Sequence, residues 1–369
     1  FYDHQQQYER AESILQEAVR SNPDDEQRWI ALVEYIAKRR GVEPAEAALQ
    51  QAKKELPRSG KLRFALGRLY ESTQRGEKAR DVYREIQSEF AGKPEALEAQ
   101  VKLAGMDWAS GKAEEAERQL EAVLKENSRS AEALMLRGRI ALQRGNGKDA
   151  VLDFRSVLKD QPELAEGHVL LARAHLMAGE PALARESLDR AITLKPKMVE
   201  AQTLLVGLDA AGGQLKEARQ RLDLLIAQEP GNMALLGMLF QLQLQEKDWS
   251  KSRDTLKQLR RAGADEALAS LAEGHVALGQ QQWDAAEAAY SKAAQQRPSA
   301  PEPIMALVQL DMRRGRLVQA QSRLEELLAK SPDHPYASGF LGELLLTKGE
   351  SAAAASHFET ATRVNPKWT

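Results

Sequence analysis

Residues 131–164 decide the fold and read AEALMLRGRIALQRGNGKDAVLDFRSVLKDQPEL. Apolar residues recur every three or four positions on both sides of a break at Gly145-Asn146-Gly147, and the stretch ends just after Pro162. That spacing is typical of an amphipathic helix, and glycine and proline commonly end helices. The stretch therefore predicts two helices that are joined by a tight turn.

The same punctuation returns along the chain at a fixed interval. Prolines follow helical stretches at Pro23, Pro57, Pro94, Pro162, Pro196, Pro230, Pro298, Pro332 and Pro366. From Pro94 onward they fall on a grid of 34 residues, on which Ser128 and Ala264 occupy the two points without proline; only Pro57 to Pro94 departs, at 37 residues. A fixed period of this length indicates an array of helix–turn–helix repeats.

Small and large residues alternate at fixed places within each unit, when the proline is numbered position 32. Position 20 is Ala11, Ala45, Ala79, Ala116, Ala150, Ala184, Ala218, Ser252, Ala286, Ala320 and Ala354. Position 24 is a leucine or an aromatic residue, and position 8 is often glycine, alanine or valine. A small residue is needed where two helices cross closely, because a larger one would overpack the contact.

Glycine marks the expected end of the first helix in most units. Position 15 is glycine at Gly111, Gly145, Gly179, Gly213, Gly315 and Gly349, and Gly41 and Gly76 lie one and two places later. Glycine adopts the left-handed conformation after a helix end without steric cost. Each unit is therefore predicted to turn at this point into its second helix.

These positions together resemble the tetratricopeptide repeat over the whole chain, although the tryptophan expected at position 4 occurs only at Trp29. The resemblance implies an all-α, right-handed superhelical solenoid of antiparallel helix pairs. Residues 1–25 are predicted to form a partial repeat and residues 26–368 ten consecutive units, with a three-residue insertion near 87–93. We expect the insertion to lengthen the second helix of its unit as a tolerated loop change; a bend at a domain boundary is the alternative. Neither end shows a capping element, so we expect the natural protein to extend further.

Composition and motifs argue against several classes of function. Charge is nearly balanced, with 52 basic and 54 acidic residues, whereas nucleic-acid binders usually carry a basic excess. There are no cysteines, and the longest apolar run, Met233 to Phe240, is too short to span a bilayer. His168 and His175 occupy packing positions, and Gly145 to Lys148 lacks the spacing of a phosphate loop. We therefore expect no enzyme activity, no cofactor, no metal and no nucleic-acid partner.

The resemblance implies that positions 2, 5, 9, 12 and 13 of the first helices line a concave groove for a protein or peptide segment. The predicted groove residues are Phe64, Arg68, Trp108, Met135, Arg139, Leu142, Val169, Arg173, Leu176 and Met177. The apolar members would anchor the partner, and the arginines would hold its carboxylates. The alternatives are that the apolar residues pack between units and that the arginines are solvated or paired within the chain.

Three short segments carry a finer resemblance. Residues 136–142, 151–155 and 247–249 resemble long proteobacterial envelope repeat proteins linked to exopolysaccharide export or to exosortase-type (PEP-CTERM) sorting. The hypothesis is a non-catalytic scaffold in a periplasmic or envelope secretion or exopolysaccharide complex, with membrane attachment only through a missing anchor. The alternatives are a regulatory domain of a larger enzyme such as a glycosyltransferase, a cytoplasmic location, and self-association of the repeats.

Overall fold

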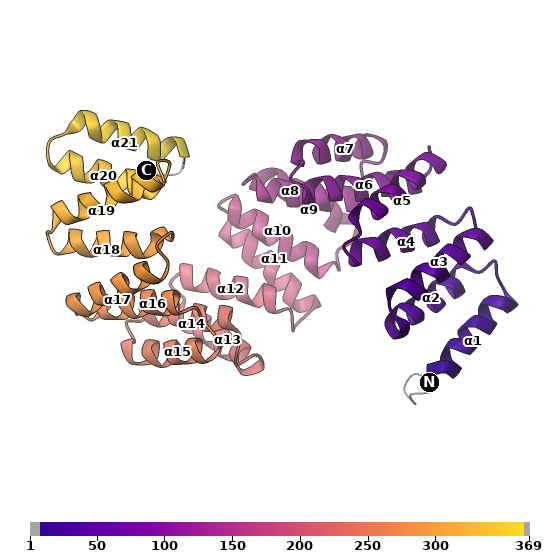
Figure 1. Ribbon diagram of the computed structural model, residues 1–369, viewed down its shortest axis with the longest axis horizontal. Helices are drawn as coiled ribbons and strands as arrows, with labels where there is room; N and C mark the ends of the chain where they lie inside the picture. Colours follow the sequence, from indigo (N-terminus) through magenta and orange to yellow (C-terminus); the bar gives the residue numbers. More distant parts are fainter. Residues whose placement is uncertain (1–7, 365–369) are drawn as a thin grey trace. The chain divides into compact units, whose positions relative to one another are not determined.

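The computed structural model describes residues 8–364, and this part of the chain contains helices and turns but no strand (Figure 1). The all-α prediction is thus confirmed. His4, Pro366 and Trp368 lie outside the described residues. The helices of the described part are α1 (Tyr8–Ser21), α2 (Glu26–Arg40), α3 (Val42–Glu55), α4 (Gly60–Ser72), α5 (Gly76–Glu89), α6 (Pro94–Ala109), α7 (Ala113–Glu126), α8 (Ala131–Gln143), α9 (Gly147–Asp160), α10 (Ala165–Met177), α11 (Pro181–Leu194), α12 (Val199–Ala211), α13 (Leu215–Gln228), α14 (Met233–Gln245), α15 (Trp249–Arg261), α16 (Glu266–Gly279), α17 (Trp283–Gln296), α18 (Pro301–Arg313), α19 (Leu317–Lys330), α20 (Pro335–Thr347) and α21 (Ser351–Val364).

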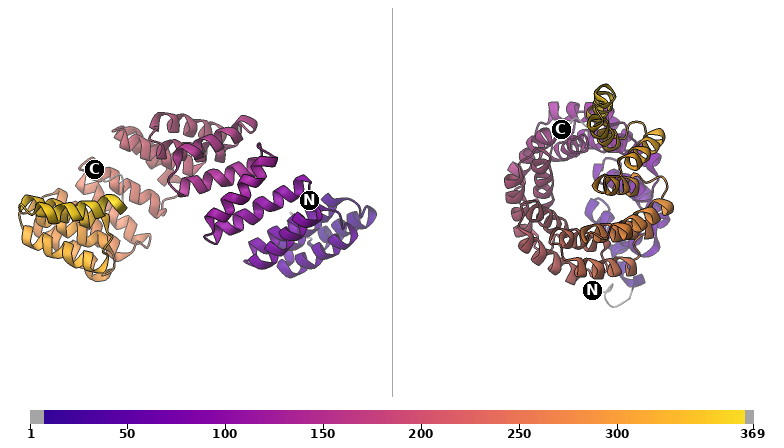
Figure 2. Two further views of the ribbon diagram at one scale, coloured as in Figure 1. Left: turned by 90° about the horizontal axis from the view of Figure 1, so that it is seen from above. Right: turned by 90° about the vertical axis from the view of Figure 1, so that its left-hand side faces the viewer.

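The chain divides into two compact units between Ala201 and Gln202. Helices that follow one another in sequence pack side by side from α1 to α11 and from α13 to α21, as the views in Figure 2 also show. The even-numbered helices from α2 are the first helices of the repeats, and the odd-numbered helices from α3 are the second. The division does not fall at the insertion near residues 87–93, where a bend was the alternative expectation.

A close helix crossing recurs in every hairpin. The residue at position 20 is at most 1% exposed in all ten complete repeats. Where position 8 is glycine, an aromatic ring from position 24 of the same hairpin occupies the space that a side chain would need; a Cβ on Gly138 would lie 2.7 Å from the Phe154 ring. The four such pairs are Gly67–Tyr83, Gly138–Phe154, Gly274–Tyr290 and Gly342–Phe358. In the other six repeats position 8 has a side chain and position 24 is leucine, so the two positions share one fixed volume.

The turn between the two helices of a repeat needs a left-handed residue. All six glycines predicted at position 15 have φ between 72° and 82°. Four repeats lack glycine at position 15. Three of them turn at Gln74, Lys247 and Gln281, with φ of 59°, 57° and 62°, and the fourth turns one residue later at Gly41, with φ of 92°. The expectation for Gly76 was wrong, because Gly76 begins α5 while Gln74 makes the turn.

The insertion lengthens a different helix from the one expected. Helix α5 ends at Glu89 and has 14 residues, the same length as α7 and α9. The chain then turns through Phe90 to Lys93, with Gly92 at φ 77°, and α6 begins at Pro94 and runs for 16 residues. Proline suits a helix start because its missing N–H has no partner there in any case. The extra residues therefore add a turn to the next first helix.

Buried polar side chains tie the helices together at two further positions. Trp29 and Arg63 at position 4 donate to the carbonyl oxygens of Pro23 and Pro57, at 2.9 and 2.7 Å, and His168 contacts that of Pro162 at 2.9 Å. At position 11, Asp107, Asp209 and Asp311 are at most 5% exposed and accept from Gln119, Arg221 and Arg323 on the second helix of the same repeat. His175, at the same position, bonds Glu180 and contacts Arg155. Both histidines that the sequence placed at packing positions thus have structural partners.

The shared volume at positions 8 and 24 can be tested with a double-mutant cycle. Gly138→Ala should destabilise the fold by about 1–3 kcal/mol, because the new methyl group overlaps the Phe154 ring. Adding Phe154→Leu should restore most of the loss, since it recreates the combination found at Ala104 and Leu120. Thermal melting of both single variants and of the double variant measures the coupling. A double variant that loses the sum of the two single effects would contradict the shared volume.

The left-handed turn at Lys247 gives a prediction of opposite sign. Lys247→Gly should stabilise the fold by about 0.5–1 kcal/mol, because glycine removes the strain of positive φ but is more flexible in the unfolded chain. Thermal melting followed by circular dichroism measures the change. Lys257→Gly inside α15 is the control and should destabilise by about 1 kcal/mol. Equal losses for both variants would show that the turn carries no strain.

Candidate partner-binding sites

Two of the ten predicted groove residues do not reach a surface. Phe64 on α4 is 4% exposed and Val169 on α10 is 1% exposed, and Phe64 belongs to the apolar core of α2 to α6. Their prediction as groove residues was wrong, because position 5 of these helices is covered by neighbouring helices. They stabilise the hairpins that carry the remaining candidates.

Four of the predicted residues come together in two adjoining clefts. Met135 and Arg139 line a cleft of about 560 Å³, with Val101, Lys102 and Met106 of α6 among its other walls. Arg139 also borders a cleft of about 380 Å³. The lining of this second cleft includes Leu142 and Arg173. We call this surface, defined by Met135, Arg139, Leu142 and Arg173, the unit 1 face.

The other four predicted residues lie on the same helices but line neither cleft. Trp108 is half-buried and donates its indole N–H to the side chain of Gln143. Leu176 is half-buried, and Arg68 and Met177 are exposed. Whether any of the eight surface candidates contacts a partner stays a prediction.

The three arginines among the predicted groove residues differ in their partners. Arg173 forms an ion pair with Glu200 at 2.7 Å, as the alternative expectation held for such side chains. In contrast, neither Arg68 nor Arg139 makes an ion pair within the described chain. Arg139 is thus the cleft arginine whose charge is available to another molecule.

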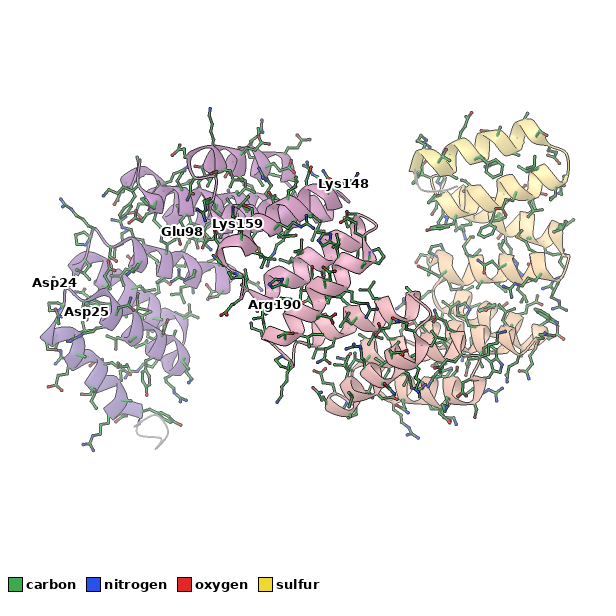
Figure 3. All side chains as sticks on the ribbon, turned by 180° about the vertical axis from the view of Figure 1, so that it is seen from behind. Asp24, Asp25, Glu98, Lys148, Lys159 and Arg190 are labelled. Carbon is green, nitrogen blue, oxygen red and sulfur yellow. The ribbon has the colours of Figure 1, made fainter. Side chains whose placement is uncertain are left out.

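Glu132 lines the first cleft of the unit 1 face, and its charge acts on a second glutamate, Glu98. Glu98 on α6, labelled in Figure 3, is half-buried and accepts no hydrogen bond within residues 8–364. Burial and the nearby charge of Glu132 raise the pKa of Glu98. Glu98 does not lie at the start of its helix, because α6 begins at Pro94 and its first turn holds Glu95.

A larger apolar cleft lies in the second unit, where none of the predicted site residues falls. It measures about 660 Å³, and α14, α15 and α16 supply its walls. Met233 and Leu268 at its border are 49% and 53% exposed, although both are large apolar residues. Gly237 also lines this cleft, and a Cβ added there would meet no atom within 4 Å. The absent side chain leaves the cleft open.

A second cleft adjoins the first at helix α16. It measures about 500 Å³, shares Leu271 and His275 with the first, and extends to Met305, Tyr336 and Phe340 on α18 and α20. We call the two clefts together the unit 2 trough. The sequence contained a signal for it, since glycine at position 5 and leucine or tyrosine at position 2 open and line the space. That signal was visible at Gly237, Leu268 and Tyr336.

His275 lines both clefts of the unit 2 trough and adds no charge to them. Its Nδ1 lies 3.0 Å from the hydroxyl of Tyr290, and the two rings meet edge to face. Burial lowers the pKa of His275, so the ring is neutral near pH 7. Burial likewise raises the pKa of Tyr290 to about 12, so the phenol keeps its proton. The pair therefore offers packing and neutral hydrogen bonding.

The described part of the chain contains no group of three or more His, Asp or Glu side chains that could hold a metal ion. No helix in residues 8–364 is both long enough and apolar enough to cross a membrane. What the clefts provide is open apolar and charged surface on successive first helices. Such surface can bind a segment of another molecule.

Family models described as tetratricopeptide repeat match most of the chain. One matches residues 37–94, 107–165, 141–199 and 305–367, and a second matches residues 175–231, 210–273 and 277–329. The chain belongs to the tetratricopeptide repeat family. An architecture made of such repeats alone is typical of non-enzymatic scaffolds, and tetratricopeptide folds generally bind protein partners. No curated protein matches the sequence of this tetratricopeptide chain.

Solved structures share its fold at low sequence identity. A tetratricopeptide repeat protein from Parabacteroides merdae ATCC 43184 is 16% identical, with a TM-score of 0.49, over 78% of this chain and 98% of its own. PilW, described as a widely conserved type IV pilus biogenesis factor, is 18% identical, with a TM-score of 0.52, over 58% of this chain and 100% of its own. A chain of the APC/C hetero-tetramer Cut9–Hcn1 is 12% identical, with a TM-score of 0.42, over 99% of this chain and 92% of its own. At these identities the similarity concerns the fold alone.

The environment of Glu98 predicts how stability depends on pH. A carboxyl whose pKa is raised by folding binds its proton more tightly in the folded state, so its ionisation destabilises the fold as pH rises above about 4.3, the unfolded value. Glu98→Gln should therefore raise the melting temperature at pH 7 and have little effect near pH 3.5. Glu166→Gln is the control of opposite sign, because the hydrogen bond from Lys195 lowers the pKa of Glu166. If Glu98→Gln changed the melting temperature equally at both pH values, the raised pKa of Glu98 in the folded state would be contradicted.

Proposed function

We propose that this protein is a non-catalytic scaffold that binds segments of partner proteins along its first helices. One observation carries the proposal: clefts in both units are lined by the same repeat positions, 2, 5, 6 and 9, of successive first helices. A recurrent lining presents a strip of surface that a chain segment can follow. The described clefts show strips of this kind without a metal-binding cluster.

The unit 1 face supports a partner segment with apolar and acidic side chains. Met135 and Leu142 supply apolar surface that is only partly buried. Arg139 supplies an unpaired guanidinium between them, which can hold a carboxylate with two parallel hydrogen bonds. Glu132 lines the same cleft, so a partner that places carboxylates elsewhere along the strip would be repelled.

We further propose that the scaffold works in a bacterial envelope complex for secretion or exopolysaccharide export. The resemblance of residues 136–142, 151–155 and 247–249 to envelope repeat proteins supports this setting. The pilus biogenesis factor PilW has a similar fold, which is compatible with such a role and adds only the fold. Fractionation of the source cells with an antibody to the chain tests the location, and recovery in the cytoplasm alone would reject it.

Affinity capture tests the scaffold function at the unit 1 face. The full chain, attached to beads, should recover a partner from an extract of the source organism, and Arg139→Glu should reduce recovery about tenfold or more by repelling the partner's carboxylate. Arg190→Glu on the second helix α11, labelled in Figure 3, is the matched control, because Arg190 is exposed and borders none of these clefts. Quantitative mass spectrometry measures recovery. Equal recovery by both variants would move the interface away from Arg139.

A further inference from the structure

The unit 2 trough differs in chemistry from the unit 1 face. Helix α14 contains no charged residue, and Met233 of α14 and Leu268 of α16 expose large apolar side chains at the border of the trough. Methionine adapts to partners of varied shape, and Met305 continues the lining on α18. Apolar patches of this kind on a soluble surface mark interaction sites.

The charges around the trough have one predominant sign. Glu302 lines the second cleft, and Glu343 lies at position 9 of α20, the helix that supplies Tyr336 and Phe340 to this cleft. Neither carboxylate has an ion-pair partner within the described residues. Asp265 borders the first cleft and pairs with Arg297 at 3.3 Å. Arg313 is the one lysine or arginine on α14, α16, α18 and α20. An apolar floor therefore lies beside unpaired carboxylates.

This combination selects among the possible occupants. Anionic lipid headgroups and acidic peptides would be repelled by Glu302 and Glu343. A second copy that docked trough to trough would bring the same carboxylates together. A segment with apolar anchors and basic side chains satisfies both features, because its cations can pair with the carboxylates while its apolar face fills the trough.

We propose that the unit 2 trough binds an apolar partner segment that carries lysine or arginine side chains. This rests on the scaffold function proposed above and names the chemistry of a second partner segment. The space left by Gly237 receives a large apolar anchor, and Glu302 and Glu343 pair with the flanking cations. The two faces of the chain thus recognise segments of different composition.

Peptide binding to the full chain tests the proposal by fluorescence anisotropy. The probes are three fluorescein-labelled peptides of equal length: a leucine–lysine amphipathic peptide, a leucine–glutamate peptide with the same pattern, and a serine–lysine peptide without apolar residues. We expect the leucine–lysine peptide to bind at least about tenfold more tightly than either other peptide. It alone can both fill the apolar trough and pair with the carboxylates beside it. Equal binding of the leucine–glutamate or serine–lysine peptide would overturn the proposal.

Matched variants locate the binding. Gly237→Leu fills the trough and should weaken leucine–lysine binding about tenfold, whereas Gly207→Leu on α12, also in open space but outside the trough, should change it less than about twofold. Glu302→Gln combined with Glu343→Gln should weaken binding about threefold at low salt, and this loss should vanish near 0.5 M salt. Equal effects of the two glycine variants would overturn the location. If the trough fails these tests while the chain still captures a partner protein, only this proposal falls. If the chain captures no partner at all, the scaffold function falls with it.

Discussion

The close crossing of two helices within each hairpin is the contact on which the rest of the structure depends. Position 20 brings the backbones together because it carries alanine or serine, buried in every complete repeat. Positions 8 and 24 then divide the remaining volume, either as glycine with an aromatic ring or as a larger residue with leucine. Both solutions fill the same space, so every hairpin offers its neighbours a similar shape and the array can continue.

The sequence predicted the features that depend on backbone geometry and small side chains. The left-handed turn at Gly145 and the buried Ala150 follow from steric rules that act within a few residues. The path of the insertion was mispredicted, because either flanking helix can absorb three residues. Gly92 and Pro94 resolve that choice by ending the turn and starting α6.

Burial of the groove positions was harder to predict, because a repeat position does not fix its surroundings. Position 5 is covered at Phe64 and Val169, partly exposed at Met135, and empty at Gly237. The sizes of side chains on the adjacent hairpin decide between these states, and they are not readable from one repeat. The same reason explains why the sequence placed the candidate site in the first unit and overlooked the trough in the second.

The glycine–aromatic pairing has a consequence for how such an array can change length. Gly138 and Phe154, whose ring fills the space beside this glycine, lie sixteen residues apart inside one repeat. The pair therefore stays together when a whole repeat is duplicated or lost. A break in the middle of a repeat could join a first helix with glycine at position 8 to a second helix with leucine at position 24, which leaves a cavity. The opposite combination places a larger residue against an aromatic ring, which causes a clash. A junction at a repeat boundary therefore keeps each pair intact, whereas a junction within a repeat keeps the packing only when both halves carry the same combination at positions 8 and 24.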